Sequence, residues 1–264
     1  MTEHPWAGRS LGERTVGYTD RDPILYALAL GADPQRLDLV FEDQLRVLPT
    51  FALTLAQWAV DSLGVSGAVD PANSLHVGQK LEVRKALPVS GEVTMAARVG
   101  SVFDKGAAAV FEVEVESDYF FAVWTLFAPG FGGFGGDRGP RAVSPREGAN
   151  DIVVPVRTFA AQPALYRLLG DRHALHIDPK AAEIAGMPGP LMHGMCTLAA
   201  STLPLAAALG GHPADLTSLH GRFTAPAFPG DELSLRAWSG DYGADFVVEH
   251  NGLTLISGAG LTFA

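Results

Sequence analysis

The segment YRLLGDRHALHIDPKAAEIAGMPGPLMHGMCTLAA, residues 166–200, decides how this chain is interpreted. It places two short apolar helical patterns around a turn that is rich in glycine and proline. In and beside that turn stand a carboxylate and three histidines: Asp171, His173, His176 and His193. Turns held by a folded scaffold are where catalytic and binding groups are usually found. We therefore look for a functional site in this segment first.

A short helix is predicted over residues 179–185. Asp178 can accept hydrogen bonds from the free N–H groups of its first turn, and proline suits the first helical position. Gly186 then allows the left-handed conformation that ends many helices. His176 consequently lies in a turn just before this helix.

Asp171 stands five residues before His176, and on a continuous helix the two side chains would point about 140° apart. They meet only if the chain turns between them, which Gly170 favours. A carboxylate beside an imidazole can serve as a general acid and base, and such groups typically contribute about 10²–10⁴ in rate. The same spacing also fits a salt bridge or a turn-capping carboxylate, so a structural role remains the alternative to a catalytic one.

Gly194 opens a second helical pattern that begins at about Met192. Its N–H lacks an intrahelical partner and carries the positive end of the helix dipole, so it can stabilise a developing oxyanion. We interpret His193 as a hydrogen-bonding group at the helix terminus. His76 and His220 have no chemical neighbours in the sequence, and we expect structural roles for both.

Two other kinds of chemistry are weaker alternatives. His173 and His176 have a spacing that metal ligands can use, but no third or fourth ligand is specified, so no metal site is predicted. Cys196 sits among apolar residues, which is typical of a small core residue rather than of a nucleophile.

The composition indicates a globular protein with a substantial core. Of the 264 residues, 47% are hydrophobic and 18% are charged, and the formal charge is −10. That charge argues against a nucleic-acid partner, since phosphates would be repelled. No window reaches the roughly 20 apolar residues that span a bilayer, and the N-terminal sequence lacks a signal-peptide core. With one cysteine, we expect a protein of the cytoplasm.

The two halves of the chain resemble each other on either side of a Gly/Pro-rich segment, residues 128–150, which reads as a linker or covering loop. LPTFALTLA (48–56) aligns with LMHGMCTLA (191–199), and SGEVTMAARV (90–99) aligns with PGDELSLRAW (229–238). Chance can match one short apolar helix. Two matches in the same order, both followed by alternating strand patterns, favour a tandem repeat.

We therefore expect an N-terminal repeat over residues 1–127 and a C-terminal repeat over residues 151–264. Each half begins with a helix and continues with several strands. The first helix is predicted over residues 49–63, and the second is predicted to kink or end at Pro204. A helix followed by a run of strands indicates an α+β protein with an antiparallel sheet.

A family resemblance follows from these residues. GDRHALHIDPKAAEIAGMPGPLMHGMCT (170–197) resembles the signature of the MaoC-like (R)-specific 2-enoyl-CoA hydratases, which usually reads G-D-x-N-P-L-H-x-D-P…A-G-F…P-I-L-H-G-L-C-T. YTDRDPILYALALGA (18–32), DLVFEDQLRVLPTFALTLA (38–56) and LPVSGEVTMAARVGSVFDKGAAAVFEVEVE (87–116) resemble the N-terminal half of the two-domain hydratases of this family. The resemblance covers nearly the whole chain.

The resemblance implies a double hot-dog fold, with two long helices each wrapped by an antiparallel sheet and the two sheets joined side by side. It implies that Asp171 and His176 are the catalytic dyad and that Gly194 donates its N–H to the thioester oxygen. In the N-terminal half, Thr50 and Phe51 replace the His-Gly pair. That half is therefore expected to be non-catalytic and to accommodate the acyl chain.

The chain departs from the family pattern at one place. His173 and Ala174 stand where the family has Asn and Pro, and that Asn is held to fix the reacting water or a substrate oxygen. An imidazole is bulkier and titrates near neutrality. We keep His173 as a substrate-binding residue and expect lower activity, a shifted pH dependence or an unusual substrate.

The implied reaction is the reversible syn hydration of a trans-2-enoyl thioester to the (R)-3-hydroxyacyl thioester, carried on CoA or acyl carrier protein. It needs no metal, nicotinamide or flavin. GFGGFGG (130–136) lies in the linker instead of opening a helix, so it is no dinucleotide motif. Two alternatives remain: a hot-dog acyl-CoA thioesterase, and a non-catalytic subunit of a heteromeric dehydratase. The family is compatible with a homodimer.

Overall fold

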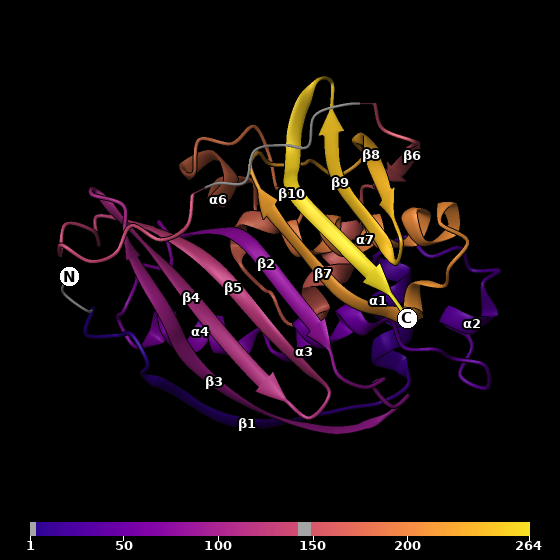
Figure 1. Ribbon diagram of the computed structural model, residues 1–264, viewed down its shortest axis with the longest axis horizontal. Helices are drawn as coiled ribbons and strands as arrows, with labels where there is room; N and C mark the ends of the chain where they lie inside the picture. The colour runs from indigo at the N-terminus through magenta and orange to yellow at the C-terminus, as the bar shows by residue number, and fades with distance from the viewer. Residues whose placement is uncertain (1–3, 142–148) are drawn as a thin grey trace.

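The ten strands of the described residues join in one antiparallel sheet (Figure 1). The computed structural model describes residues 4–141 and 149–264, so residues 142–148 of the predicted linker lie outside the described residues. The first half contributes β1 (Ser10–Tyr18), β2 (Leu75–Val83), β3 (Gly91–Asp104), β4 (Ala108–Ser117) and β5 (Phe120–Pro129). The second half contributes β6 (Ile152–Arg157), β7 (Leu216–Phe223), β8 (Glu232–Gly240), β9 (Gly243–His250) and β10 (Leu253–Phe263).

The two halves have the same strand order when each is followed from its outer edge to the centre. That order is β1-β3-β4-β5-β2 in the first half and β6-β8-β9-β10-β7 in the second. β2 and β7 pair at the centre, from Gly78 opposite Arg222 to Glu82 opposite Ser218. The halves therefore share one backbone hydrogen-bond ladder, and their buried apolar residues form one core.

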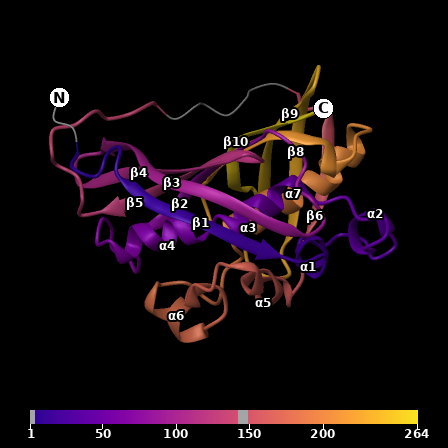
Figure 2. The ribbon, with the colours of Figure 1, turned by 90° about the horizontal axis from the view of Figure 1, so that it is seen from below.

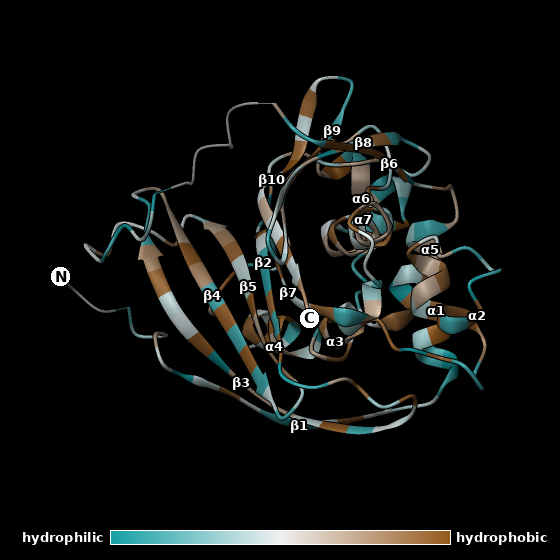
Figure 3. Ribbon diagram, turned by 45° about the vertical axis from the view of Figure 1, so that its right-hand side comes forward, coloured by the Kyte–Doolittle hydropathy of each residue, from teal (hydrophilic) through white to brown (hydrophobic). Residues whose placement is uncertain are grey.

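The helices lie on the concave side of the sheet (Figures 1 and 2). In the first half they are α1 (Arg21–Ala29), α2 (Leu37–Val40), η1 (Pro49–Phe51), α3 (Ala52–Leu55) and α4 (Trp58–Val65). In the second half they are α5 (Gln162–Tyr166), η2 (Arg167–Leu169), η3 (Ala174–His176), α6 (Pro179–Ile184), α7 (Gly194–Ala208) and η4 (Pro213–Asp215). Figure 3 shows the strands of the second half curving around α7. This arrangement confirms the predicted α+β class.

The first central helix differs from the prediction. Residues 49–63 were expected to form one helix, but η1, α3 and α4 follow one another with a break at Ala56 and Gln57. A Cβ placed on Gly170 would lie 3.0 Å from the carbonyl oxygen of Thr54 and 3.4 Å from Cβ of Gln57. The second half thus packs its backbone against the first half at this break. The prediction missed the break because the contact joins residues more than a hundred positions apart.

The other helix boundaries depend on local sequence signals. α6 begins as predicted, with the Asp178 carboxylate accepting a hydrogen bond of 2.9 Å from the Lys180 N–H, and Gly186 follows it with φ +72°. Pro204 was predicted to kink or end this helix; α7 continues through it to Ala208, so of the two alternatives the end is wrong. Proline removes one helical N–H, and the almost continuous burial of α7 outweighs that loss.

Among the helices of residues 4–141 and 149–264, none combines the length and the apolar character needed to cross a bilayer.

The described start of the linker is held by a single buried carboxylate. Asp104 accepts hydrogen bonds from the N–H groups of Gly106, Gly133 and Gly135, at 2.7 to 2.9 Å. These donors hold the pKa of Asp104 at about 2, below its usual value. The Gly-rich segment is therefore fixed against the end of β3.

We expect Gly170→Ala to lower the free energy of unfolding by about 2–3 kcal/mol, because Gly170 has φ +149° and its Cβ would press on the Thr54 carbonyl. Gly186→Ala is the matched control. It also has positive φ, but nothing lies within 4 Å of its Cβ, so we expect a loss of about 1 kcal/mol. Denaturant unfolding measures both, and equal losses would contradict the contact between the halves.

We expect Asp104→Asn to lower the melting temperature at pH 7 and to speed amide exchange in residues 131–137. Because the pKa of Asp104 is lower in the folded than in the unfolded protein, its stabilisation is present above about pH 4 and lost as the pH falls toward 2. The difference between variant and wild type should shrink over that range. Asp137→Asn, an exposed carboxylate of the same segment, is the control.

Candidate active site

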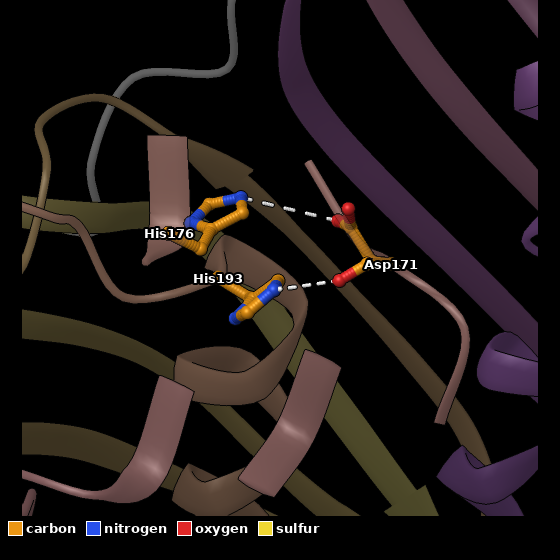
Figure 4. A group of neighbouring side chains, drawn as sticks. All are labelled: Asp171, His176 and His193. Atoms are coloured by element: carbon orange, nitrogen blue, oxygen red, sulfur yellow. Dashed lines mark hydrogen bonds and ion pairs between the residues drawn. The ribbon is translucent and has the colours of Figure 1, made fainter. Parts of the chain in front are cut away.

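The turn between Asp171 and His176 brings their side chains together, as the sequence predicts (Figure 4). After Gly170, the Asp171 Oδ1 accepts the His173 backbone N–H at 3.1 Å, and η3 then turns the chain back. Asp171 Oδ2 and His176 Nε2 lie 3.9 Å apart. The carboxylate is thus oriented by the backbone of residue 173, whichever side chain stands there.

The tautomer of His176 follows from its other ring nitrogen. His176 Nδ1 lies 3.0 Å from the carbonyl oxygen of Leu191, which can only accept, so Nδ1 carries the hydrogen. In the neutral ring, Nε2 is then a bare acceptor that faces the acceptor oxygen of Asp171. Two acceptors do not bond each other directly, which accounts for a separation longer than a hydrogen bond.

The dyad is largely shielded from solvent. The side chains of His176 and Asp171 are 14% and 20% exposed. Burial lowers the pKa of His176, and the neighbouring Asp171 charge and the Leu191 carbonyl only partly oppose that effect. The ring is therefore neutral near pH 7 and able to accept a proton.

His193 contacts both members of the dyad. Its ring stacks on His176 with 3.7 Å between centroids and a 25° interplanar angle. Its Nε2 lies 3.2 Å from the backbone oxygen of Asp171, to which it donates (Figure 4). His193 is the residue before α7 and uses its ring to bond the Asp171 carbonyl, so it is a hydrogen-bonding group at the helix terminus, as interpreted, but it does not cap α7 itself. Burial and the adjacent His176 keep the pKa of His193 well below its usual range.

Gly194 is the first residue of α7, so its N–H has no intrahelical partner. A Cβ on Gly194 would lie 3.1 to 3.2 Å from three ring atoms of Phe223. Only glycine fits here without displacing that ring. The geometry thus leaves the predicted N–H donor beside the stacked imidazoles.

His173 and Cys196 have different surroundings. The His173 ring is exposed, and its Nδ1 accepts the Leu175 N–H at 3.3 Å. Cys196 is fully buried, which raises the pKa of its thiol, and it lies near Gln162 Nε2 and the Ala29 carbonyl. It is a core residue, as predicted.

One group of metal-ligating atoms occurs at the dyad. Asp171, His176 and His193 each offer an atom within 4.8 Å of the others. However, the His193 Nε2 carries a hydrogen, and two nearly parallel rings do not aim their nitrogens at one point. The residues fit a divalent cation poorly, and catalysis without a metal or organic cofactor stays a prediction.

A cavity of about 370 Å³ opens beside His176. Its walls are mainly apolar and come from the second half of the chain: Ala160, Pro163, Ala164, Ile177, Pro188, Gly189, Pro190, Phe228 and Pro229. Of Asp171 and His176, His176 is the one that lines this cavity. An apolar cavity with one polar group in its wall suits a ligand with a chain and one reactive group.

Some contacts of the site had no signal in the sequence. The Leu191 carbonyl is a backbone group, which any residue supplies. Tyr166, fully buried against His193 with 4.8 Å between ring centroids, was seen only as a neighbour. His76 reaches the site from β2 of the other half, so only the fold could find it.

Comparison with known proteins agrees with this geometry. Residues 17–120 match the family described as MFE-2 hydratase 2 N-terminal domain, and residues 143–254 match the MaoC like domain. 3-Hydroxyacyl-thioester dehydratase Y of Mycobacterium tuberculosis is 37% identical over 239 residues, covering 84% of this chain and 82% of the relative. Enoyl-CoA hydratase ChsH3 of the same organism is 35% identical over 251 residues, covering 88% and 87%.

A solved structure extends the comparison to the fold. The crystal structure of a MaoC-like dehydratase from Phytophthora capsici aligns with a TM-score of 0.85 at 26% identity, covering 96% of this chain and 95% of that one. The double hot-dog architecture implied by the sequence is thereby confirmed. This chain belongs to the MaoC-like (R)-specific enoyl-CoA hydratases of the hydratase 2 type.

Proposed function

We propose that this chain catalyses the reversible syn hydration of a trans-2-enoyl-CoA to the (R)-3-hydroxyacyl-CoA, with Asp171 and His176 holding the reacting water. The observation that carries this proposal is the pair of facing acceptors, Asp171 Oδ2 and His176 Nε2, 3.9 Å apart beside an apolar cavity. A water molecule has two O–H donors, so it can satisfy both acceptors at once. Its oxygen lone pairs then face outward, toward a substrate in the cavity.

In the hydration direction, the water oxygen attaches to C3 of the enoyl group while His176 Nε2 accepts one of its protons. The charge on Asp171 stabilises the imidazolium that forms. The imidazolium then returns that proton to C2 on the same face. One water is consumed, with its hydroxyl on C3 and its hydrogen on C2, which gives syn addition.

Negative charge develops on the thioester oxygen as the C3–O bond forms. We assign its stabilisation to the Gly194 N–H at the start of α7. Removing one donor of this kind typically costs about 2.7–4 kcal/mol of transition-state stabilisation. His173, exposed beside the dyad, is retained as a substrate-contacting residue.

The remaining assignments are also proposals. Relatives named enoyl-CoA hydratase support CoA as the carrier of the substrate. The first half, with a broken helix where the second half has α7, is assigned the role of accommodating the part of the acyl chain that extends beyond the cavity at His176, whose walls come from the second half. We propose a cytoplasmic homodimer, although some relatives are named as peroxisomal proteins.

We expect Asp171→Asn and His176→Gln each to lower kcat for crotonyl-CoA hydration by at least about 10²-fold, because the first removes the carboxylate charge that stabilises the imidazolium and the second removes the ring nitrogen that accepts the proton. The loss of enoyl-thioester absorbance measures the rate, and unchanged melting temperatures control for folding. Wild-type rates in either variant would refute the dyad.

The same assay separates the alternative activities. Release of free thiol without hydroxyacyl product would identify a thioesterase. An inactive wild-type chain that gains activity with a second protein would identify a non-catalytic subunit.

We expect kcat/KM to decline on the acidic side with a midpoint below pH 6.5. His176 acts as a neutral base, and burial lowers its pKa from that ordinary value. Asp171 raises that pKa, whereas His173 and His193 face the ring as further titratable groups. In Asp171→Asn, the His176 titration followed by NMR should move to still lower pH. An upward shift would contradict the assigned contact.

A further inference from the structure

His76 is a half-buried imidazole that the proposed reaction does not use. It lies on β2, in the half without the dyad, and β2 pairs with β7 at the centre of the sheet. Its ring meets Phe223, the last residue of β7, edge to face, with 4.9 Å between centroids and a 74° interplanar angle. The sheet thus brings these two residues together across the seam between the halves.

Phe223 in turn lies directly on Gly194. Three atoms of its ring lie 3.1 to 3.2 Å from the position of a Cβ on Gly194. The ring therefore covers the side of Gly194 on which a Cβ would stand, at the residue that supplies the first N–H of α7.

His76 is held in one orientation. Its Nε2 lies 2.9 Å from the Gly78 carbonyl oxygen, to which it donates across an irregularity in β2. Burial lowers the pKa of His76 to about 4, and Asp171 and His176 are close enough to influence it. The ring is therefore neutral, oriented and close to the dyad.

We propose that His76 is a positioning residue for hydration: its ring holds Phe223 against Gly194 and so fixes the direction of the Gly194 N–H toward the thioester oxygen. The proposal rests on the function proposed above. The competing explanation is that His76 serves only to satisfy the Gly78 carbonyl. The two explanations differ in whether the ring or the hydrogen bond matters.

Two substitutions separate these explanations. His76→Phe keeps an aromatic ring against Phe223 but loses the donor to Gly78, whereas His76→Gln keeps a donor but loses the ring. His220→Gln is the control, since His220 is an exposed imidazole on β7 that pairs with Lys80 of β2. It makes none of the ring contacts found for His76 in the described residues.

The readout is the carbonyl stretching frequency of bound butyryl-CoA labelled with ¹³C at the thioester carbon. This thioester is saturated, so it cannot be hydrated, and its frequency falls when an N–H donor polarises the carbonyl. We expect the wild type, His76→Phe and His220→Gln to lower the frequency alike. In His76→Gln the frequency should return toward that of free butyryl-CoA.

Turnover of crotonyl-CoA gives a second readout. His76→Gln should lower kcat by about 3- to 10-fold, the size expected for loss of one aromatic contact, with a smaller change in KM. In a Phe223→Leu background the same substitution should have no further effect, because the ring that His76 positions is absent. Phe223→Leu alone, which removes the same ring contact from the other side, should lower kcat to a similar extent and tests the proposal if His76→Gln is unstable.

The opposite pattern overturns the proposal: full carbonyl polarisation and full kcat in His76→Gln, with losses in His76→Phe. A wild-type frequency equal to that of free butyryl-CoA overturns it as well, together with the role of Gly194. The carbonyl measurement needs no turnover. It therefore tests the positioning role of His76 even if the wild type fails to hydrate crotonyl-CoA. That failure would refute only the proposed function.

Discussion

The hydrogen bond from His176 Nδ1 to the Leu191 carbonyl is the interaction on which the site depends. It fixes which ring nitrogen is bare and aims that nitrogen at Asp171. The same segment is tied to the turn a second time, since the Leu191 N–H donates to the Leu175 carbonyl at 3.1 Å. Two backbone groups of one residue therefore join η3 to the start of α7. The contacts that fold this turn therefore also orient the His176 ring.

The sequence predicted the parts of the site that depend on local spacing. Asp178 and Gly186 mark the ends of α6, and Gly170 allows the turn that brings Asp171 to His176. It could not predict the parts supplied by the backbone or by distant strands. The Leu191 carbonyl has no sequence signature, and His76 meets Phe223 only because β2 pairs with β7.

The break in the first central helix shows the same limit. Pro49 and the apolar pattern after it are consistent with one helix, and nothing near Ala56 argues for an interruption. The reason lies in the second half, where Gly170 brings its backbone against Thr54. Local propensity is a weak prior that tertiary packing overrides. The same glycine therefore lies both at the turn before Asp171 and against the helix break of the other repeat.

The matching positions in the two repeats are filled differently. Where the second half has Gly194 and an N–H beside the imidazoles, the aligned residue of the first half is Phe51, packed edge to face on Tyr18 and tilted against Tyr26, with centroids 5.2 and 5.5 Å apart. An aromatic side chain thus fills the place that the second half leaves open. The two halves therefore share their strand order but differ in the residues at these aligned positions. Under the proposed function, a sheet made of two repeats therefore serves one thioester per chain, which leaves no pair of equivalent centres within the polypeptide to act cooperatively.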